Sequence, residues 1–209
     1  MSDTAYIHWA TEKLKVPDPA VKKVWSGDNS TVYEIDRWFL KIGAGLSPEC
    51  ERLRWLNGRL PVPEVVAFST LEGKDALVTT AIAGKNLAEL KQLLPVSDIV
   101  EMLASALRAF HDAGTDGCSF KAAISGDVLV HGDACLPNIM FHGDGTLSGF
   151  VDLGEMGLGG IEVDLAAAVW SLQYNLGPGH GLAFLRAYGR TDATDSDVDR
   201  LWTMYANEI

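Results

Sequence analysis

Residues 131–154 read HGDACLPNIMFHGDGTLSGFVDLG and are the most informative stretch of the chain. It places Asn138 five positions after Asp133 and Asp152 14 positions after Asn138. A Gly-Asp-Gly segment at 143–145 separates two mostly apolar runs, which is the composition of a tight β-hairpin turn. Such a hairpin brings Asn138 and Asp152 side by side. Carboxylate and amide oxygens that converge in this way suit Mg²⁺, which takes a few protein ligands together with phosphates.

The order of these residues also occurs in a known group of enzymes. Protein kinases carry a catalytic-loop Asp, an Asn five positions later, and then Asp-Phe-Gly. This chain repeats the order with Asp133, Asn138 and Asp152-Leu153-Gly154. Its opening, His131-Gly132-Asp133, resembles the aminoglycoside phosphotransferase family, the antibiotic-resistance kinases with a protein-kinase-like fold. The alternative is a loop and hairpin whose acids only face water, and three motifs in register argue against it.

Composition narrows the class of protein. A chain of 209 residues, 47% of them hydrophobic, can bury a full core as one domain or as two small lobes. The net charge of −11 argues against nucleic acid as a partner and is compatible with a cationic substrate, although an acidic balance also simply aids solubility. No run of about 18 apolar residues predicts a membrane span.

Three scattered cysteines are too few for a disulfide framework or a zinc site. The first six residues lack a basic region before an apolar core, so they do not resemble a signal peptide. We therefore expect reduced thiols in a cytoplasmic protein, either monomer or dimer.

The first part of the chain predicts a sheet. Five short runs rich in β-branched and aromatic residues predict strands, at 21–25, 31–35, 38–42, 62–68 and 76–80. A helix is expected to open at Ser47-Pro48-Glu49, where the serine can cap, the proline fits the first turn and Glu49 favours the positive end. The prediction is a five-stranded sheet with one helix.

Beyond residue 84 the apolar residues recur at helical spacing. Helices are predicted at 87–94, 97–110, 163–176, 181–188 and 197–207. The fold class is therefore α+β. The resemblance implies a bilobal protein-kinase-like fold, with an antiparallel β-sheet N-lobe over residues 1–83 and a mainly helical C-lobe over residues 84–209.

Lys41 ends the third predicted strand among apolar neighbours, where an unpaired buried charge is costly. Glu49 on the following helix is a natural partner. The resemblance implies that this pair holds the phosphates of ATP. It also favours Glu49 over Glu51, because the family's glutamate stands six residues before a Trp-Leu pair, here Trp55-Leu56. A plain surface lysine is the alternative.

The resemblance implies further nucleotide contacts. Phe39 matches an aromatic position that stacks on adenine, with a core phenylalanine as an equal alternative. The backbone from Thr80 to Ile82 would meet the adenine edge. Residues 26–30 stand in place of the phosphate-covering loop, and a plain hairpin turn explains them equally well.

The resemblance assigns the chemistry to the 131–154 stretch. Asp133 is the catalytic residue that accepts or orients the hydroxyl proton, and Asn138 with Asp152 holds Mg²⁺. His131 is expected to orient the loop rather than to transfer protons. Asp164 is expected to be structural, and His111 to end a helix without a catalytic role. Nothing near Cys135 in the sequence predicts a reactive thiol.

The resemblance covers nearly the whole chain and is strongest to enzymes that phosphorylate the 3′-hydroxyl of kanamycin-like drugs. Three departures concern the acceptor. A helical insert that precedes the family's catalytic loop is almost absent. Glu155 and Trp170 stand where the family often has arginines, and the chain ends at Glu208-Ile209 where the family often ends in Glu-aromatic-aromatic.

The predicted function is that of a small-molecule kinase. It would transfer the γ-phosphate of ATP, with Mg²⁺, to a hydroxyl of an aminoglycoside antibiotic, the 3′-hydroxyl first, and so confer resistance. Glu155 and Glu208 are the predicted contacts for a cationic drug, with Asp127 and Glu162 as further candidates. Two alternatives stay open: a kinase for another small hydroxylated compound, and a nucleotide-binding protein with little catalysis.

Overall fold

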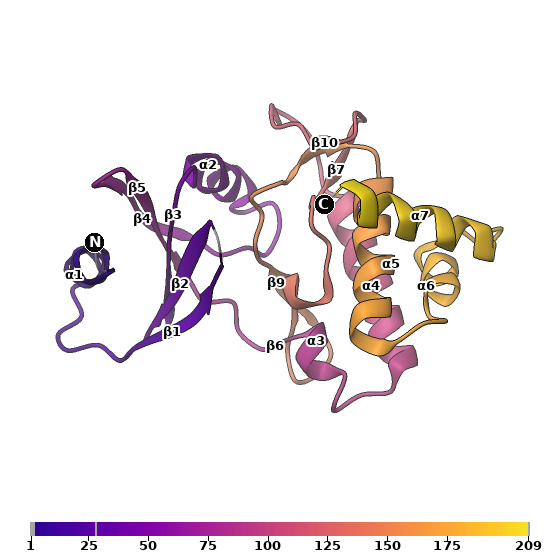
Figure 1. Ribbon diagram of the computed structural model, residues 1–209, viewed down its shortest axis with the longest axis horizontal. Helices are drawn as coiled ribbons and strands as arrows, with labels where there is room; N and C mark the ends of the chain where they lie inside the picture. Colours follow the sequence, from indigo (N-terminus) through magenta and orange to yellow (C-terminus); the bar gives the residue numbers. More distant parts are fainter. Residues whose placement is uncertain (1–2, 28, 209) are drawn as a thin grey trace. The chain divides into compact units, whose positions relative to one another are not determined.

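A computed structural model describes residues 3–27 and 29–208, apart from the side chains of residues 207 and 208. The chain divides into two compact units. Unit 1 comprises Met1–Asn57 and Val62–Ala81, and unit 2 comprises Gly58–Pro61 and Ile82–Ile209. Unit 1 holds an antiparallel sheet and unit 2 is mainly helical (Figure 1), which confirms the α+β class. No helix in these described ranges is long and apolar enough to span a membrane.

Unit 1 is built on the predicted five-stranded sheet, in the order β1-β2-β3-β5-β4 with every pair antiparallel. Its strands are β1 (Val21–Ser26), β2 (Ser30–Ile35), β3 (Trp38–Gly43), β4 (Val65–Leu71) and β5 (Lys74–Thr80). The strand predicted at 62–68 began too early, since Pro63 lacks the N–H that a strand ladder needs, and β4 starts at Val65.

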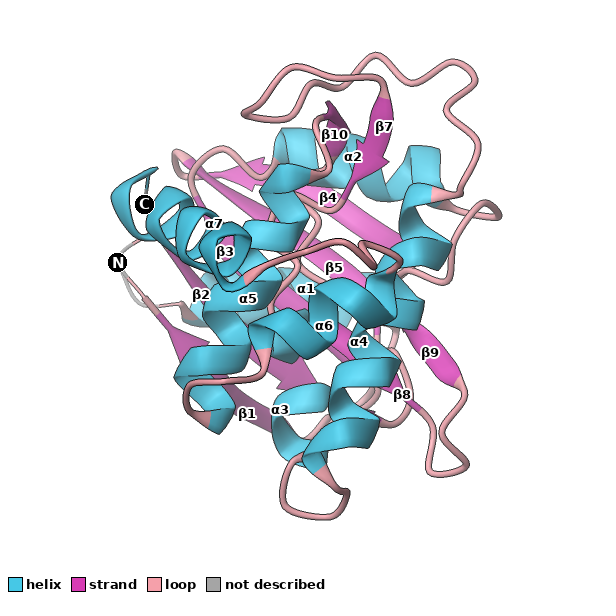
Figure 2. Cartoon of the chain, turned by 90° about the vertical axis from the view of Figure 1, so that its right-hand side faces the viewer, coloured by secondary structure: helices cyan, strands magenta, loops and turns pink. Residues whose placement is uncertain are grey.

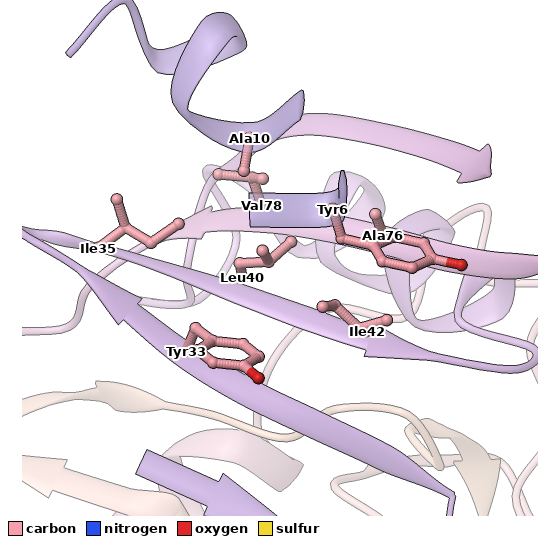
Figure 3. Close-up of a cluster of buried hydrophobic side chains, with 8 residues drawn as sticks. All are labelled: Tyr6, Ala10, Tyr33, Ile35, Leu40, Ile42, Ala76 and Val78. Carbon is pink, nitrogen blue, oxygen red and sulfur yellow. The ribbon is translucent and has the colours of Figure 1, made fainter. Parts of the chain in front are cut away.

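Helix α1 (Thr4–Leu14) covers one face of this sheet, and the prediction of a single helix in this part of the chain was wrong. Tyr6 and Ala10 of α1 pack with six buried strand residues in one cluster (Figure 3), namely Tyr33, Ile35, Leu40, Ile42, Ala76 and Val78. The signal for α1 was Tyr6, Ala10 and Leu14, which recur every four residues.

Helix α2 (Ser47–Leu56) begins where predicted, but Ser47 does not cap it. The N-cap position belongs to Leu46, whose N–H donates to the buried Asp75 carboxylate at 2.8 Å. The Leu46 carbonyl accepts from Cys50 N–H at 3.0 Å and starts the helix. The Asp75 carboxylate on strand β5 therefore binds the backbone at the start of α2, the role that the sequence predicts for the Ser47 hydroxyl.

Unit 2 contains the predicted helices, now seen as α3 (Leu87–Leu90), α4 (Val96–His111), α5 (Glu162–Leu176), α6 (Gly181–Tyr188) and α7 (Asp195–Glu208). Helix α3 is shorter than predicted. Helix α5 packs against α7, and α4 packs against α6 (Figure 2). Seven residues of α4 are buried, in agreement with its regular apolar spacing.

Short strands frame the loop between α4 and α5. Strands β8 (Ile139–Phe141) and β9 (Leu147–Phe150) form the predicted hairpin, and β6 (Lys85–Asn86) adds to its edge. A separate pair joins β7 (Val128–Val130) to β10 (Gly157–Gly159). The residues from 131 to 138 thus run between two antiparallel pairs, which fix both ends of this loop.

Candidate active site

The hairpin brings Asn138 and Asp152 together, as the sequence predicts. Strands β8 and β9 pair from Ile139 opposite Phe150, and the N–H of Val151 donates to the carbonyl of Asn138 at 2.9 Å. Asp152 follows directly and is exposed, with a backbone φ of 59°. This left-handed conformation is uncommon for a residue other than glycine, and such strain is concentrated at functional sites.

Asp133 is held at both carboxylate oxygens. The amide Nδ2 of Asn138 donates to Oδ2 at 2.9 Å and also lies 3.0 Å from the Asp133 carbonyl. The hydroxyl of Tyr205, from α7, donates to Oδ1 at 3.3 Å. Because both partners of the Asn138 amide nitrogen are acceptors, the nitrogen must face Asp133. The Asn138 Oδ1 is then the amide atom left to accept or to bind a cation.

These donors fit a magnesium ion that is shared with phosphates. The Asn138 amide oxygen and the Asp152 carboxylate are hard oxygen ligands on adjacent chain segments, and Mg²⁺ commonly takes one or two carboxylates besides water and phosphate. Among the described side chains, those of residues 3–27 and 29–206, no three His, Cys, Asp or Glu residues cluster as a metal cage would require.

A buried carboxylate anchors the start of the loop. Asp164, in the first turn of α5, is fully buried and accepts from the backbone N–H groups of His131 at 2.7 Å and Gly132 at 2.8 Å. Its Oδ2 also lies 2.9 Å from His111 Nε2, and His111 Nδ1 lies 2.7 Å from the Tyr188 hydroxyl. The structural role expected for Asp164 is thus specific: it holds the residues that precede Asp133.

His131 occupies an apolar site. Its side chain is fully buried between the rings of Phe110 and Phe150, at centroid distances of 5.5 and 6.2 Å. Its Nδ1 accepts from the Asp133 N–H at 3.3 Å, so the ring proton is on Nε2. That Nε2 has no hydrogen-bond partner among the described residues. A buried ring that binds the Asp133 N–H suits orientation of the loop.

Gly132 brings Glu155 next to the loop. Its φ is 91°, and a Cβ at this position would lie 2.5 Å from the Glu155 carbonyl oxygen. The close approach follows from the pairing of Val130 with Gly157 just beyond. Glu155, a predicted substrate contact, is exposed here. The side chain of Glu208 and all of Ile209 lie outside the described residues.

The Lys41–Glu49 ion pair is present in unit 1, with Lys41 Nζ 2.8 Å from Glu49 Oε2. Their side chains are 22% and 10% exposed, whereas Glu51 is exposed, which agrees with the choice of Glu49. Strand alternation turns Leu40 into the buried cluster and Lys41 to the opposite face of the sheet. The Glu49 carboxylate therefore compensates the positive charge of Lys41, whose partial burial without a partner would cost free energy.

Phe39 shares the sheet face of Lys41 and is half-buried outside the buried cluster, so it is not a core phenylalanine. Thr80 N–H donates to the Glu64 carbonyl at 3.0 Å, and Ala81 N–H to that of Arg37 at 3.1 Å. In unit 2, the Ile82 side chain lies against the backbone of Gly149 in β9.

The turn at 26–30 includes Asp28, which lies outside the described residues. Its Gly27 N–H donates to the Ser30 carbonyl at 3.0 Å, as in an ordinary hairpin. That N–H is thus used within the turn, which favours the plain-turn alternative at this position.

Cys135 lies in the loop but is not activated. Its side chain is buried, and the pKa of its thiol is raised to about 12, chiefly by this burial and also by the nearby Asp133 carboxylate, which repels a thiolate. A thiol with this pKa stays protonated at neutral pH, which agrees with the expectation that Cys135 is not a nucleophile.

Tyr205 is the functional candidate that the sequence analysis missed. It lies 72 positions from the aspartate it contacts, and helix α7 had only an apolar periodicity to mark it. The sequence also predicts roles for His111 and Asp164 separately but not the contact between these two residues, which lie 53 positions apart. No local pattern connects positions so far apart.

Comparison with known proteins identifies the family to which the chain belongs. The model of the "Phosphotransferase enzyme family" matches residues 21–127 and 125–202. Among curated proteins, an aminoglycoside 3′-phosphotransferase of Niallia circulans is 27% identical, over 93% of this chain and 95% of its own length. One from Escherichia coli is 26% identical, over 79% and 83%. The Niallia alignment spans 253 positions, more than the 209 residues here, so that relative carries additional residues within the matched region.

Solved structures share the fold. Aminoglycoside phosphotransferase APH(3″)-Id from Streptomyces rimosus superposes with a TM-score of 0.76 at 19% identity, and 96% of each chain is covered. A type VIII aminoglycoside-3′-phosphotransferase gives 0.69 at 23% identity, over 90% of this chain and 93% of the other. The Streptomyces rimosus protein has also been solved in complex with ADP and streptomycin. These likenesses confirm the predicted kinase-like architecture.

The close approach at Gly132 can be tested by Gly132→Ala. The added methyl meets the Glu155 backbone and is strained at positive φ, so we expect the free energy of unfolding to fall by about 2 kcal/mol or more. Gly143→Ala is the matched control, because its Cβ would point into open space and its φ is not positive. Urea denaturation measures both. Equal stability of the two variants would show that the loop does not pack against Glu155.

Proposed function

Because this chain belongs to the phosphotransferase enzyme family, we propose that it transfers the γ-phosphate of Mg·ATP to a hydroxyl of an aminoglycoside, the 3′-hydroxyl first, and so confers resistance. One observation carries the proposal. A carboxylate, Asp133, is fixed by Asn138 and Tyr205 next to a hairpin that presents the Asp152 carboxylate. This set matches what phosphoryl transfer needs, namely a group for the hydroxyl proton and oxygen ligands for a cation.

Asp133 receives the acceptor hydroxyl in this proposal. Its Oδ1 and Oδ2 each accept one hydrogen bond from the protein, and a carboxylate has room for about four. The remaining lone pairs can accept from a substrate O–H without breaking either bond. The residue orients the hydroxyl and takes its proton as the bond to phosphorus forms. Most of the rate would come from positioning and electrostatics, since the transition state demands little covalent help.

Asn138 and Asp152 would hold Mg²⁺, which neutralises phosphate charge when it is bound. The Asn138 amide links the two functions, because its nitrogen binds Asp133 while its oxygen is left for the cation. Movement of the cation ligand therefore also moves the group that binds the hydroxyl. ATP as the donor is supported by the ADP complex of the Streptomyces rimosus structure.

The remaining nucleotide contacts are assigned from unit 1 and from Ile82. The Lys41 ammonium, held by Glu49, would neutralise α- and β-phosphate oxygens. Phe39 lies on the same face of the sheet as Lys41, which suits stacking on adenine. Since the N–H groups of Thr80 and Ala81 are used internally, carbonyl oxygens and the Ile82 N–H would meet the adenine edge.

The molecule that accepts the phosphate is the part of the proposal for which alternatives exist. Relatives named as aminoglycoside phosphotransferases and the net charge of −11 favour a cationic drug, with Glu155 beside the loop and Glu208 as contacts. Yet the chain lacks residues that the Niallia protein carries within the matched region. If those residues hold the drug in the relative, this chain would not act on an aminoglycoside. It would then be a kinase for another small hydroxylated compound or a nucleotide-binding protein with little catalysis.

Asp133→Asn tests the catalytic assignment. The amide is isosteric: its one oxygen can still accept from Asn138, and its NH₂ group can donate to the Tyr205 hydroxyl, which then acts as the acceptor, so nucleotide binding should stay intact. Turnover should fall by about 10²–10⁴-fold, the usual contribution of a general base. ADP release with kanamycin as acceptor measures kcat, and Asp199→Asn, an exposed carboxylate of the same unit, is the control. A loss of only a few-fold would remove Asp133 from this role.

Asp152→Ala and Asn138→Ala separate the two cation ligands. Removal of the charged ligand should abolish Mg-dependent ATP binding, whereas loss of the neutral amide should weaken it less. Asn138→Ala should instead lower kcat strongly, because Asp133 loses the donor at its Oδ2. Isothermal titration with and without Mg²⁺ gives the affinities. Unchanged affinity in Asp152→Ala would show that the cation is held elsewhere.

A further inference from the structure

A row of three aromatic rings leads away from Asp133 in unit 2. Tyr205 of α7 donates its hydroxyl to Asp133 Oδ1 at 3.3 Å. Its ring packs against Trp170 of α5 at a centroid distance of 5.1 Å, and Trp170 stacks on Tyr174 at 5.0 Å with only 9° between the planes. We call Tyr205, Trp170 and Tyr174 the aromatic row. One end therefore contacts the carboxylate to which we assign the acceptor hydroxyl.

The other end of the row reaches solvent. Tyr174 is 75% exposed, the most exposed large hydrophobic side chain among the described residues. The packing of α5 against α7 explains the half-buried rings of Tyr205 and Trp170. It does not explain Tyr174, since a ring that stays in water contributes little to the stability of the unit. The Tyr174 ring thus lies in water at the end of a row of packed rings that begins at Asp133.

The hydroxyl of Tyr205 makes the row part of the site. Burial raises the pKa of Tyr205, and the nearby Asp133 and Cys135 raise it further. The hydroxyl stays protonated and donates to Asp133. A molecule bound at Asp133 has the Tyr205 ring beside it, and Trp170 and Tyr174 continue the row from there.

Resting on the proposed function, we propose that the aromatic row is an acceptor subsite that binds an amino-substituted sugar ring remote from the phosphorylated hydroxyl. Aromatic faces attract ammonium groups and cover the apolar C–H face of a sugar. Trp170 and Tyr174 offer two stacked aromatic faces for such a ring. The row supplies contact area that acidic side chains alone do not.

The chemistry of the row predicts a particular dependence on salt. Exposed ammonium–carboxylate pairs weaken as salt rises, because the Debye length shrinks from about 30 Å at 0.01 M to about 8 Å at 0.15 M. Contact between a ring and a sugar face is far less sensitive. The contribution of Tyr174 to binding should therefore persist when the contribution of Glu155 has faded.

Kanamycin binding, measured by isothermal titration at low and physiological salt, tests the subsite without needing turnover. Tyr174→Ala should weaken binding by about three- to five-fold at both salt concentrations. Tyr174→Phe keeps the ring and should bind as the wild type does. Gln173→Ala, the exposed neighbour on the same helix, is the matched control and should have no effect. Glu155→Gln should weaken binding mainly at low salt.

Two results would overturn the subsite: equal affinity of Tyr174→Ala and wild type, or no kanamycin binding by the wild type at low salt. Phosphorylation of a neutral hydroxylated compound in the second case would leave the phosphotransferase function standing without an aminoglycoside. Kanamycin binding that depends on Tyr174 without any turnover would support the subsite and contradict the kinase assignment. Binding measurements thus test the subsite, and turnover measurements separately test the kinase function.

Discussion

The candidate site depends on the buried Asp164 carboxylate. It accepts the N–H groups of two successive loop residues, His131 and Gly132, and it contacts His111 on α4. A carboxylate with no exposed surface is stable only when such partners surround it, and loss of one partner leaves an uncompensated charge. The same requirement that keeps Asp164 paired therefore keeps the backbone before Asp133 in one position.

The remaining constraints act on the other side of Asp133. The β8–β9 hairpin fixes Asn138, whose amide binds the Asp133 carboxylate, and α7 supplies Tyr205 to the second oxygen. Two segments distant in sequence thus bind the Asp133 carboxylate, through Asn138 and Tyr205, while α5 holds the backbone just before it through Asp164. This convergence has the form that a preorganised catalytic group requires, since each donor is held by its own secondary structure.

Much of this could be predicted from the sequence, because the informative signals were local. The Gly-Asp-Gly turn between apolar runs fixed the hairpin, and regular apolar spacing located α4 to α7. The Lys41–Glu49 pair was predictable because a strand-end lysine needs a partner and the next helix offers one. Helix α1 was overlooked although its apolar residues recur every four positions.

Contacts between distant positions were beyond the sequence. Asp75 replaces Ser47 at the start of α2, Tyr205 reaches Asp133, and His111 meets Asp164 across 53 positions. Each of these contacts depends on how helices and strands pack against one another. No short sequence pattern encodes that packing. The approach of Gly132 to Glu155 belongs to the same group, because it results from the β7–β10 pairing rather than from either residue.

Amide hydrogen exchange at His131 and Gly132 tests most directly whether Asp164 holds the loop. In Asp164→Asn the side chain keeps only one oxygen and presents an NH₂ group to the second N–H. Hydrogen bonds to a charged group contribute about 1.5–3 kcal/mol, so exchange at these amides should accelerate by about tenfold or more. Asp199→Asn, on the surface of α7, should leave both rates unchanged. Unaltered exchange at His131 and Gly132 in Asp164→Asn, with the protein still folded, would contradict the account.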